Sequence, residues 1–251
     1  MTNTDTFDPT TSEDAFCLGE LGADLIPHVW AGMSSAAPER ANQDAWQADH
    51  GVWAVADGMG GLDEGAQAAR FVAQRFVALA RMRTAPELVG FVRTLSDELI
   101  ERFGTNSGTT LVGGVLHGTS LDVVYVGDSR VFRLREGRLE LVTRDHTVRE
   151  LALELGTDPN SLTRRQVQGL TSYVGQAGDS VNVGRRSFSV TPGDRLVFLT
   201  DGVHRSVPFA ELQEMTQSQP IDELPGLLVD IARRNSSVDD ATALVVEVSQ
   251  S

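Results

Sequence analysis

The stretch Val52–Gly61, which reads V-W-A-V-A-D-G-M-G-G, decides the fold that the sequence predicts. Its apolar residues form a run with the character of a buried strand, and this run ends on Asp57. The glycines that follow allow the backbone to turn tightly beside the carboxylate. Taking a carboxylate out of water costs several kcal/mol unless a cation or strong hydrogen bonds compensate. We therefore expect Asp57 to have a cationic partner.

Further acidic residues stand beside other apolar runs. The run V-V-Y-V-G-D ends at Asp128, L-V-F-L-T-D-G contains Asp201, and the pair Asp239–Asp240 opens A-T-A-L-V-V-E-V. Acids placed at the ends of several strands indicate one shared site for polyvalent cations. Because the candidates are carboxylates, with few histidines and no set of thiolates, the site favours Mg²⁺ or Mn²⁺ over Zn²⁺.

The composition restricts the class of protein. With 251 residues, of which 41% are hydrophobic and 22% charged, the chain suits one soluble domain with a substantial core. A formal charge of −14 argues against nucleic acid or anionic membrane as partners. The single cysteine fits a reducing compartment, and no membrane-spanning run or secretory signal is visible, so we expect a cytoplasmic protein. Residues 1–14 have the composition of a disordered leader, and residues 15–251 are expected to form the domain.

Hydrophobic periodicity predicts the elements on both sides of this stretch. A short strand near His28–Gly32 precedes it, and helical spacing follows in Gly65–Ala80 and Pro86–Phe103. Short glycine-containing links then separate four strands, which predicts an antiparallel meander: Thr109–Val115, Leu121–Val126, Val131–Arg135 and Leu139–Thr143.

The second half of the chain begins with residues 145–174, which are expected to form an irregular insert over the sheet. Strands resume after it, two helices follow, and a final strand closes the chain: Arg186–Val190, Arg195–Thr200, Phe209–Met215, Glu223–Arg234 and Ala241–Val248. This order predicts an α+β fold in which helices pack on antiparallel sheet.

A pair of divalent ions about 3.5–4 Å apart, bridged by a carboxylate and a water, produces hydroxide near neutral pH. Such a site suits phosphoryl transfer, because the ions neutralise the nonbridging oxygens of the phosphate. Arg40 lies on a predicted loop ahead of the central strand, and its guanidinium is a candidate fork for the phosphate.

Six segments occur in an order that is specific as a set, although each alone is weak. They are Arg40-Ala41-Asn42-Gln43-Asp44, Asp57-Gly58-Met59-Gly60-Gly61, Ser107-Gly108-Thr109-Thr110, Val126-Gly127-Asp128-Ser129-Arg130, Leu199-Thr200-Asp201-Gly202 and Asp239-Asp240-Ala241-Thr242. Over roughly residues 28–248 the chain resembles the metal-dependent protein serine/threonine phosphatases of the type 2C family, bacterial branch.

The resemblance implies a four-layer αββα sandwich, with two central antiparallel sheets flanked by helices. It also implies hydrolysis of phosphoserine or phosphothreonine in proteins by a hydroxide that bridges two Mn²⁺ or Mg²⁺ ions. The partners would be phosphorylated proteins that are targets of a serine/threonine protein kinase in bacterial signalling, and we expect the enzyme to be a monomer.

Site roles follow from the resemblance, position by position. Asp57 should bridge the two ions, and the carbonyl of Gly58 should bind one of them. Asp201 and Asp239 should hold the other ion, while Asp128 and Asp201 match the residues that hold a third, weaker ion in bacterial relatives. Asp44 is expected to act through metal-bound water, Arg40 to bind phosphate, and residues 145–174 to form a mobile flap.

Three departures from animal relatives, or from the usual pattern, bear on the site. Gln43 replaces a glutamate, which removes a negative charge near the second ion, and Met59 replaces a histidine that is the proposed general acid; a thioether has no proton to give. His204-Arg205 stand where relatives often have an acid, so contacts to the substrate differ there. Because it follows Asp201 closely, His204 is itself a candidate contact for the substrate.

Other interpretations stay open at this point. These departures also suit a weakly active phosphatase-like module that binds phosphoproteins, and the substrate of an active enzyme could be a phosphorylated anti-sigma-factor antagonist. Asp128 could simply cap a turn, and Arg40 could be an ordinary surface arginine. A structural role is the preferred interpretation for four histidines: His28, His50, His117 and His146.

Overall fold

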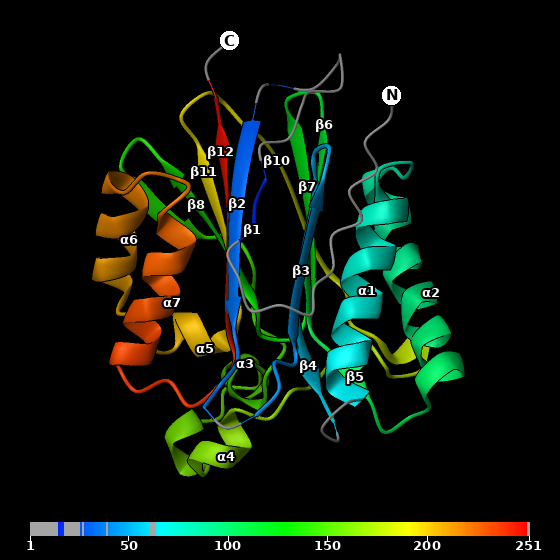
Figure 1. The fold of residues 1–251 in the computed structure, drawn as a ribbon. Coiled ribbons are helices and arrows are strands. Elements are labelled where there is room, and N and C mark those ends of the chain that lie inside the picture. The colour runs from blue at the N-terminus through cyan, green and yellow to red at the C-terminus, as the bar shows by residue number, and fades with distance from the viewer. Residues whose placement is uncertain (1–14, 18–25, 27, 39, 61–63, 250–251) are drawn as a thin grey trace.

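The computed structural model describes residues 15–17, 26, 28–38, 40–60 and 64–249. The predicted leader of residues 1–14, and Gly61 in the central motif, lie outside these described residues. Two sheets stand face to face in the middle of the molecule, and helices cover the outer face of each (Figure 1). This arrangement is the predicted four-layer αββα sandwich.

All neighbouring strands in both sheets are antiparallel. The first sheet has the order β1 (Ala15–Cys17), β2 (His28–Ser35), β12 (Ala241–Val248), β11 (Arg195–Leu199), β8 (Arg130–Arg135) and β9 (Arg138–Leu141). The second has the order β10 (Gly184–Ser189), β7 (Ser120–Val126), β6 (Leu111–His117), β4 (Val52–Met59) and β3 (Asp44–Asp49), and β5 (Gly108–Thr109) pairs with the end of β4.

The long helices form the outer layers. The second sheet is covered by α1 (Glu64–Ala80) and α2 (Ala85–Phe103), and the first by α6 (Phe209–Ser218) and α7 (Leu224–Arg234) (Figure 1). Short helices fill the connections: α3 (Val148–Glu154), η1 (Pro159–Ser161), α4 (Arg164–Val167), η2 (Gly178–Ser180) and α5 (Asp201–His204). None of the helices in the described part of the chain is long and apolar enough to cross a lipid bilayer.

Three buried clusters hold the four layers together. Between the sheets, Trp53 of β4 lies in one cluster with Phe198 of β11 and Leu244 of β12. The other two clusters fill the spaces between each sheet and its helices. Because β4 is buried on both faces, its sequence is a continuous apolar run without the alternation of a half-exposed strand.

The predicted meander is wrong in one respect. The strand pairs β6–β7 and β8–β9 form as hairpins, but β7 and β8 belong to different sheets. The turn Gly127–Ser129 carries the chain from one sheet to the other. The same holds for β10 and β11, which follow each other in sequence without pairing. In addition, β4 continues past Asp57 to Met59, and β3 forms where no strand was expected.

Candidate active site

The acidic residues singled out in the sequence come together at one end of the two sheets. Asp44 opens β3 and pairs in register with Asp57 near the end of β4. Asp201 and Asp128 each lie two positions after the end of a strand, β11 and β7, and Asp239 precedes β12 by two positions. Antiparallel pairing brings the end of one strand beside the start of its neighbour, as the end of β4 lies beside the start of β3 and the end of β11 beside the start of β12. In Figure 1 these strand ends meet at the lower end of the sandwich, above α4.

Electrostatics show how closely the carboxylates gather. Burial raises the pKa of Asp57 well above its usual value, and the charges of four other acids raise it further: Asp44, Asp201, Asp128 and Asp239. Burial also raises the pKa of Asp201, whose carboxyl lies against that of Asp57. Such a cluster is unfavourable when all its members are ionised, so it requires positive charge among the carboxylates.

Asp44 is held by two threonines from the first sheet. The hydroxyls of Thr200 and Thr242 each donate a hydrogen bond of 2.8 Å to Oδ2 of Asp44. Its other oxygen, Oδ1, is buried and has no hydrogen-bond partner among the described residues. Burial raises the pKa of Asp44 to about 8, and the nearby Asp240 and Asp201 carboxylates add to the rise. One oxygen of Asp44 is therefore fixed, and the other is available to a cation or its water.

The G-T-T segment fixes the backbone of Asp57. Thr110 accepts a hydrogen bond of 2.9 Å from the Asp57 amide with its hydroxyl, and its own amide donates to the Asp57 carbonyl, also at 2.9 Å. The hydroxyl of Thr109 donates to the same carbonyl at 2.9 Å. Because the backbone is held on both sides, the Asp57 side chain is directed into the acidic cluster by the strand itself.

Two glycines of the motifs are required by space. A Cβ on Gly58 would lie 2.2 Å from the carbonyl oxygen of Gly65 and 2.6 Å from that of Gln43. A Cβ on Gly202 would lie 1.9 Å from the carbonyl oxygen of Asp240. The chain segments that carry the acids therefore approach each other more closely than any side chain allows.

Arg40 lies beside the acid pair that opens β12. Its Nη2 forms ion pairs with both Asp239 and Asp240, the latter at 3.0 Å. Asp240 is buried and also accepts hydrogen bonds from the backbone amides of Ala37 at 2.6 Å and Gln43 at 2.9 Å. Asp240 thus shapes the loop that carries Arg40, whereas the Asp239 side chain is half exposed at 48%.

His204 and Arg205 both face Asp128. Nε2 of His204 donates to the carbonyl oxygen of Asp128 at 2.9 Å, and Arg205 forms ion pairs with the carboxylates of Asp128 and Asp201. Burial lowers the pKa of the His204 imidazole well below its usual value, so this ring is neutral near pH 7. These contacts turn His204 toward the Gly127–Ser129 turn.

The insert of residues 145–174 is anchored to the same turn. Arg130 donates two hydrogen bonds to the Asp145 carboxylate, at 2.9 and 2.7 Å. His146 donates from its amide to the Gly127 carbonyl at 2.8 Å and accepts from the Gly127 amide on Nδ1 at 3.2 Å. The base of the predicted flap is therefore tied to the motif that contains Asp128.

The donor set fits divalent cations of the hard, oxygen-preferring kind. Its members offer carboxylate and carbonyl oxygens, and Oδ1 of Asp201, like that of Asp44, is buried without a hydrogen-bond partner in the described part of the chain. Within the same residues, no three His, Cys, Asp or Glu side chains form a complete ligand group. Arg40 and Arg205 form ion pairs with some of the acids. The positive charge that the cluster requires is thus only partly supplied by the protein.

Several residues that shape the site had no assigned role in the sequence. Thr200 and Thr242 stand inside L-T-D-G and D-D-A-T, so their position beside the acids was a usable signal. Arg205 follows His204 in the sequence, but nothing in this short stretch indicates that its guanidinium pairs with Asp128 and Asp201. No feature of the sequence indicates a role for Arg233 in the site. In the structure it donates to the carbonyls of Ser35 at 2.7 Å and Ala36 at 2.8 Å, and also to that of Asp239.

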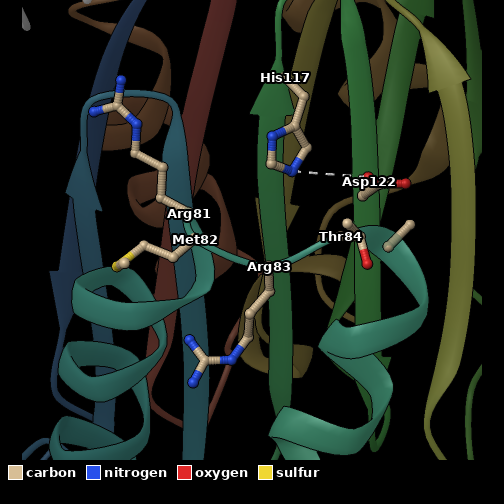
Figure 2. A pocket seen from close by; sticks show the side chains of 7 residues that line it. Arg81, Met82, Arg83, Thr84, His117 and Asp122 are labelled. Carbon is tan, nitrogen blue, oxygen red and sulfur yellow. Dashed lines mark ion pairs between the residues drawn. The ribbon is translucent and has the colours of Figure 1, made fainter.

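A separate surface pocket lies at the opposite end of the second sheet. It has a volume of about 360 Å³ and is lined by the turn between α1 and α2 and by the facing strands, with Arg81, Met82, Arg83, Thr84, Ala85, His117 and Asp122 (Figure 2). His117 is the last residue of β6, and it follows Val115, which pairs with Val52 at the start of β4. Asp57 lies near the other end of β4. The pocket is therefore distinct from the acidic cluster.

Comparison with known proteins places the chain among phosphatases. Residues 31–235 match the family described as protein phosphatase 2C. The serine/threonine protein phosphatase PstP of Mycobacterium tuberculosis is 26% identical over 216 residues, which cover 82% of this chain and 42% of PstP. The serine/threonine phosphatase Stp of Listeria monocytogenes is 25% identical over 209 residues, which cover 77% of this chain and 82% of Stp.

Among solved structures, the catalytic domain of PstP in complex with two manganese ions superimposes with a TM-score of 0.75 at 25% identity. The match covers 89% of this chain and 99% of that domain. The chain thus spans less than half of full-length PstP but nearly all of its catalytic domain.

Proposed function

Because the chain belongs to the protein phosphatase 2C family, we propose that it is a metal-dependent protein serine/threonine phosphatase. The observation that carries this proposal is the gathering of Asp44, Asp57, Asp201 and Asp239 at one end of the sandwich. The relatives named above as serine/threonine phosphatases, and the manganese ions in the PstP structure, support the same activity.

The residues that would hold two Mn²⁺ or Mg²⁺ ions are Asp57, the carbonyl of Gly58, Asp201 and Asp239, with Asp44 reaching them through water. When bound, the ions would supply Lewis-acid activation of water and neutralise the phosphate. The protein's own part is to hold the acids in place, which the threonines beside Asp44 and Asp57 do through hydrogen bonds.

Arg40 is the proposed phosphate-binding residue. Its side chain is 38% exposed, and its Nη2 already lies beside Asp239. A guanidinium has five N–H donors, so Arg40 can keep its contact with buried Asp240 and still offer donors to a phosphate. His204, which faces Asp128, would influence substrate binding mainly by holding the Gly127–Ser129 turn.

The proposed substrates are phosphorylated proteins, the targets of a serine/threonine protein kinase, on which the enzyme acts as a cytoplasmic monomer. Support for the compartment comes from the single cysteine, which fits a reducing environment. We propose in addition that residues 145–174 act as a flap beside the site, because Arg130 and His146 anchor the start of this segment next to Asp128.

A turnover assay tests the proposal. The purified chain is mixed with a phosphothreonine peptide or p-nitrophenyl phosphate, in Mn²⁺, in Mg²⁺ and in excess chelator. Release of phosphate with either ion, and its loss in chelator, is the expected result. Absence of turnover with both ions would contradict the proposal. Tight binding of the phosphopeptide without turnover or bound metal would instead identify the phosphoprotein-binding module.

A further inference from the structure

The guanidinium of Arg205 lies between two acids that come from different sheets. Its Nη1 is 2.6 Å from Oδ2 of Asp201, and its Nη2 forms an ion pair with Oδ2 of Asp128. The two carboxylates are largely buried, with side-chain exposures of 5% for Asp128 and 11% for Asp201. A single side chain of this protein therefore bridges the two acids.

Local structure holds Arg205 in this position. Asp201 opens the single turn of α5, and the Arg205 amide donates to the Asp201 carbonyl at 3.0 Å, so the two side chains lie on the same face. The neighbouring residue, His204, donates from Nε2 to the Asp128 carbonyl at 2.9 Å. Two successive side chains thus bind the carbonyl and the carboxylate of Asp128.

This arrangement does not fit a divalent ion between Asp128 and Asp201. A guanidinium offers only donors and stays charged, so it has no lone pair with which to join a ligand shell. A divalent ion in the same place would meet its positive charge at short range and would have to displace it from two buried carboxylates. Displacing the guanidinium would break its charge-assisted contacts with both carboxylates, which are stronger than hydrogen bonds between neutral groups.

We propose that Arg205 is a built-in cation that takes the place of the third metal ion, so that this chain binds two divalent ions instead of three. The inference rests on the proposed two-ion phosphatase. Arg205 then acts as a positioning residue, because it holds Oδ2 of Asp201 in an ion pair while Oδ1 of Asp201 stays available to a metal ion.

Metal stoichiometry tests the inference without an activity readout. Mn²⁺ bound per chain is counted by equilibrium dialysis and by electron paramagnetic resonance of the free ion. The wild type should bind two ions. Arg205→Ser removes the guanidinium, and Arg205→Asp puts a carboxylate in its place; both variants should bind a third ion. Arg75→Ser, which removes an arginine from a partly exposed pair with Glu98, is the control matched to Arg205→Ser in net charge and should bind two.

The wild-type count alone keeps the inference testable if the variants do not fold, which circular dichroism would show. A third ion between Asp128 and Asp201 in an anomalous-scattering map of wild-type crystals soaked in Mn²⁺ would overturn the inference and leave the proposed phosphatase intact. Folded Arg205→Ser and Arg205→Asp proteins that still bind two ions would also overturn it. A wild-type chain that binds no Mn²⁺ would overturn both proposals.

Discussion

Thr242 donates its hydroxyl hydrogen to Oδ2 of Asp44 at 2.8 Å, although 198 positions separate the two residues. Since the proton of Thr242 points to the carboxylate, its oxygen must accept from Ser34, which lies 2.6 Å away. The side-chain amide of Asn42 in turn donates to the Ser34 oxygen at 2.7 Å. A directed chain of hydrogen bonds therefore runs from the loop before β3 through β2 and β12 to Asp44.

Replacing Thr242 by valine keeps the shape of the side chain and removes the donor to Asp44. We expect Thr242→Val to lower the free energy of unfolding by about 1–3 kcal/mol, because the buried Asp44 carboxyl group loses a hydrogen bond. Urea unfolding in chelator measures the change. The control is Thr216→Val, another buried threonine, whose hydroxyl donates to the Leu212 carbonyl within a helix and should cost less. Equal losses of unfolding free energy in both variants would show that the hydrogen bond to Asp44 stabilises the fold no more than the one from Thr216 to Leu212.

Asp57→Asn should separate stability from catalysis. Without metal, burial and the neighbouring acids make the ionised Asp57 carboxylate unfavourable in the folded state, and an amide has no charge to bury, so the substitution should raise the free energy of unfolding. The same change should abolish the rise in melting temperature that Mn²⁺ gives the wild type and reduce turnover at least about 100-fold.

Thermal unfolding in chelator and in Mn²⁺, together with the phosphopeptide assay, measures these three effects. Asp230→Asn removes an exposed acid from α7 and serves as the matched control, with little change in any of them. An Asp57→Asn protein that keeps wild-type turnover would show that the proposed site is misplaced.

Local patterns predicted most elements, because periodicity along one segment determines which of its faces is buried. The final strand was predicted as Ala241–Val248 and occurs with these bounds, and the helix predicted from Gly65 ends at Ala80 as expected. The pairing of β7 with β8 was predicted wrongly for a physical reason. Alternation shows that a strand has a buried face but carries no information about which strand lies beside it.

At the site, too, features within one segment could be predicted from the sequence, whereas contacts between distant segments could not. Asp57 and Asp201 were found because an acid next to a buried apolar run is unusual in a short window of sequence. The bridge from Arg205 to Asp128 joins positions 77 apart, on opposite sheets, and only the crossing at Gly127–Ser129 brings them together. Contacts of this kind depend on the packing of the two sheets, which no single segment specifies.

His28, which lies far from the acidic cluster, should make the stability of the protein depend on pH. It is 4% exposed, its Nδ1 lies 2.9 Å from the Ile26 carbonyl, and its ring contacts Trp53 edge-on at 5.2 Å. Burial lowers the pKa of its imidazole. Above about pH 6.5 the ring is neutral in both states; as the pH falls further, the unfolded chain takes up a proton that the folded chain resists. Stability therefore falls with falling pH over this range.

His28→Phe should remove this component of the pH dependence. The loss of unfolding free energy between about pH 7.5 and about pH 5 should be smaller in the variant than in the wild type. Urea unfolding at both pH values provides the comparison, and other titrating groups cancel in the difference between the two proteins. Equal pH dependence in both would mean that His28 is protonated as easily when folded as when unfolded.

A pair of glycine-to-alanine substitutions tests how tightly the end of β4 is packed. A Cβ at position 58 would meet the backbone oxygens of Gly65 and Gln43, which have no freedom to move without shifting α1 or the loop before β3. Gly58→Ala should lower the free energy of unfolding by about 2–4 kcal/mol and displace the carbonyl proposed to bind metal.

Gly90→Ala is the matched control for this test, because Gly90 is exposed on α2 and a Cβ there would meet no atom within 4 Å. Alanine has the higher helix propensity, so this variant should gain about 0.5–1 kcal/mol. Urea unfolding in chelator compares the two variants, and a Mn²⁺ titration of each follows the site itself. If Gly58→Ala were as stable as the wild type and bound Mn²⁺ equally well, the backbone at the acidic cluster would have to be far looser than these contacts indicate.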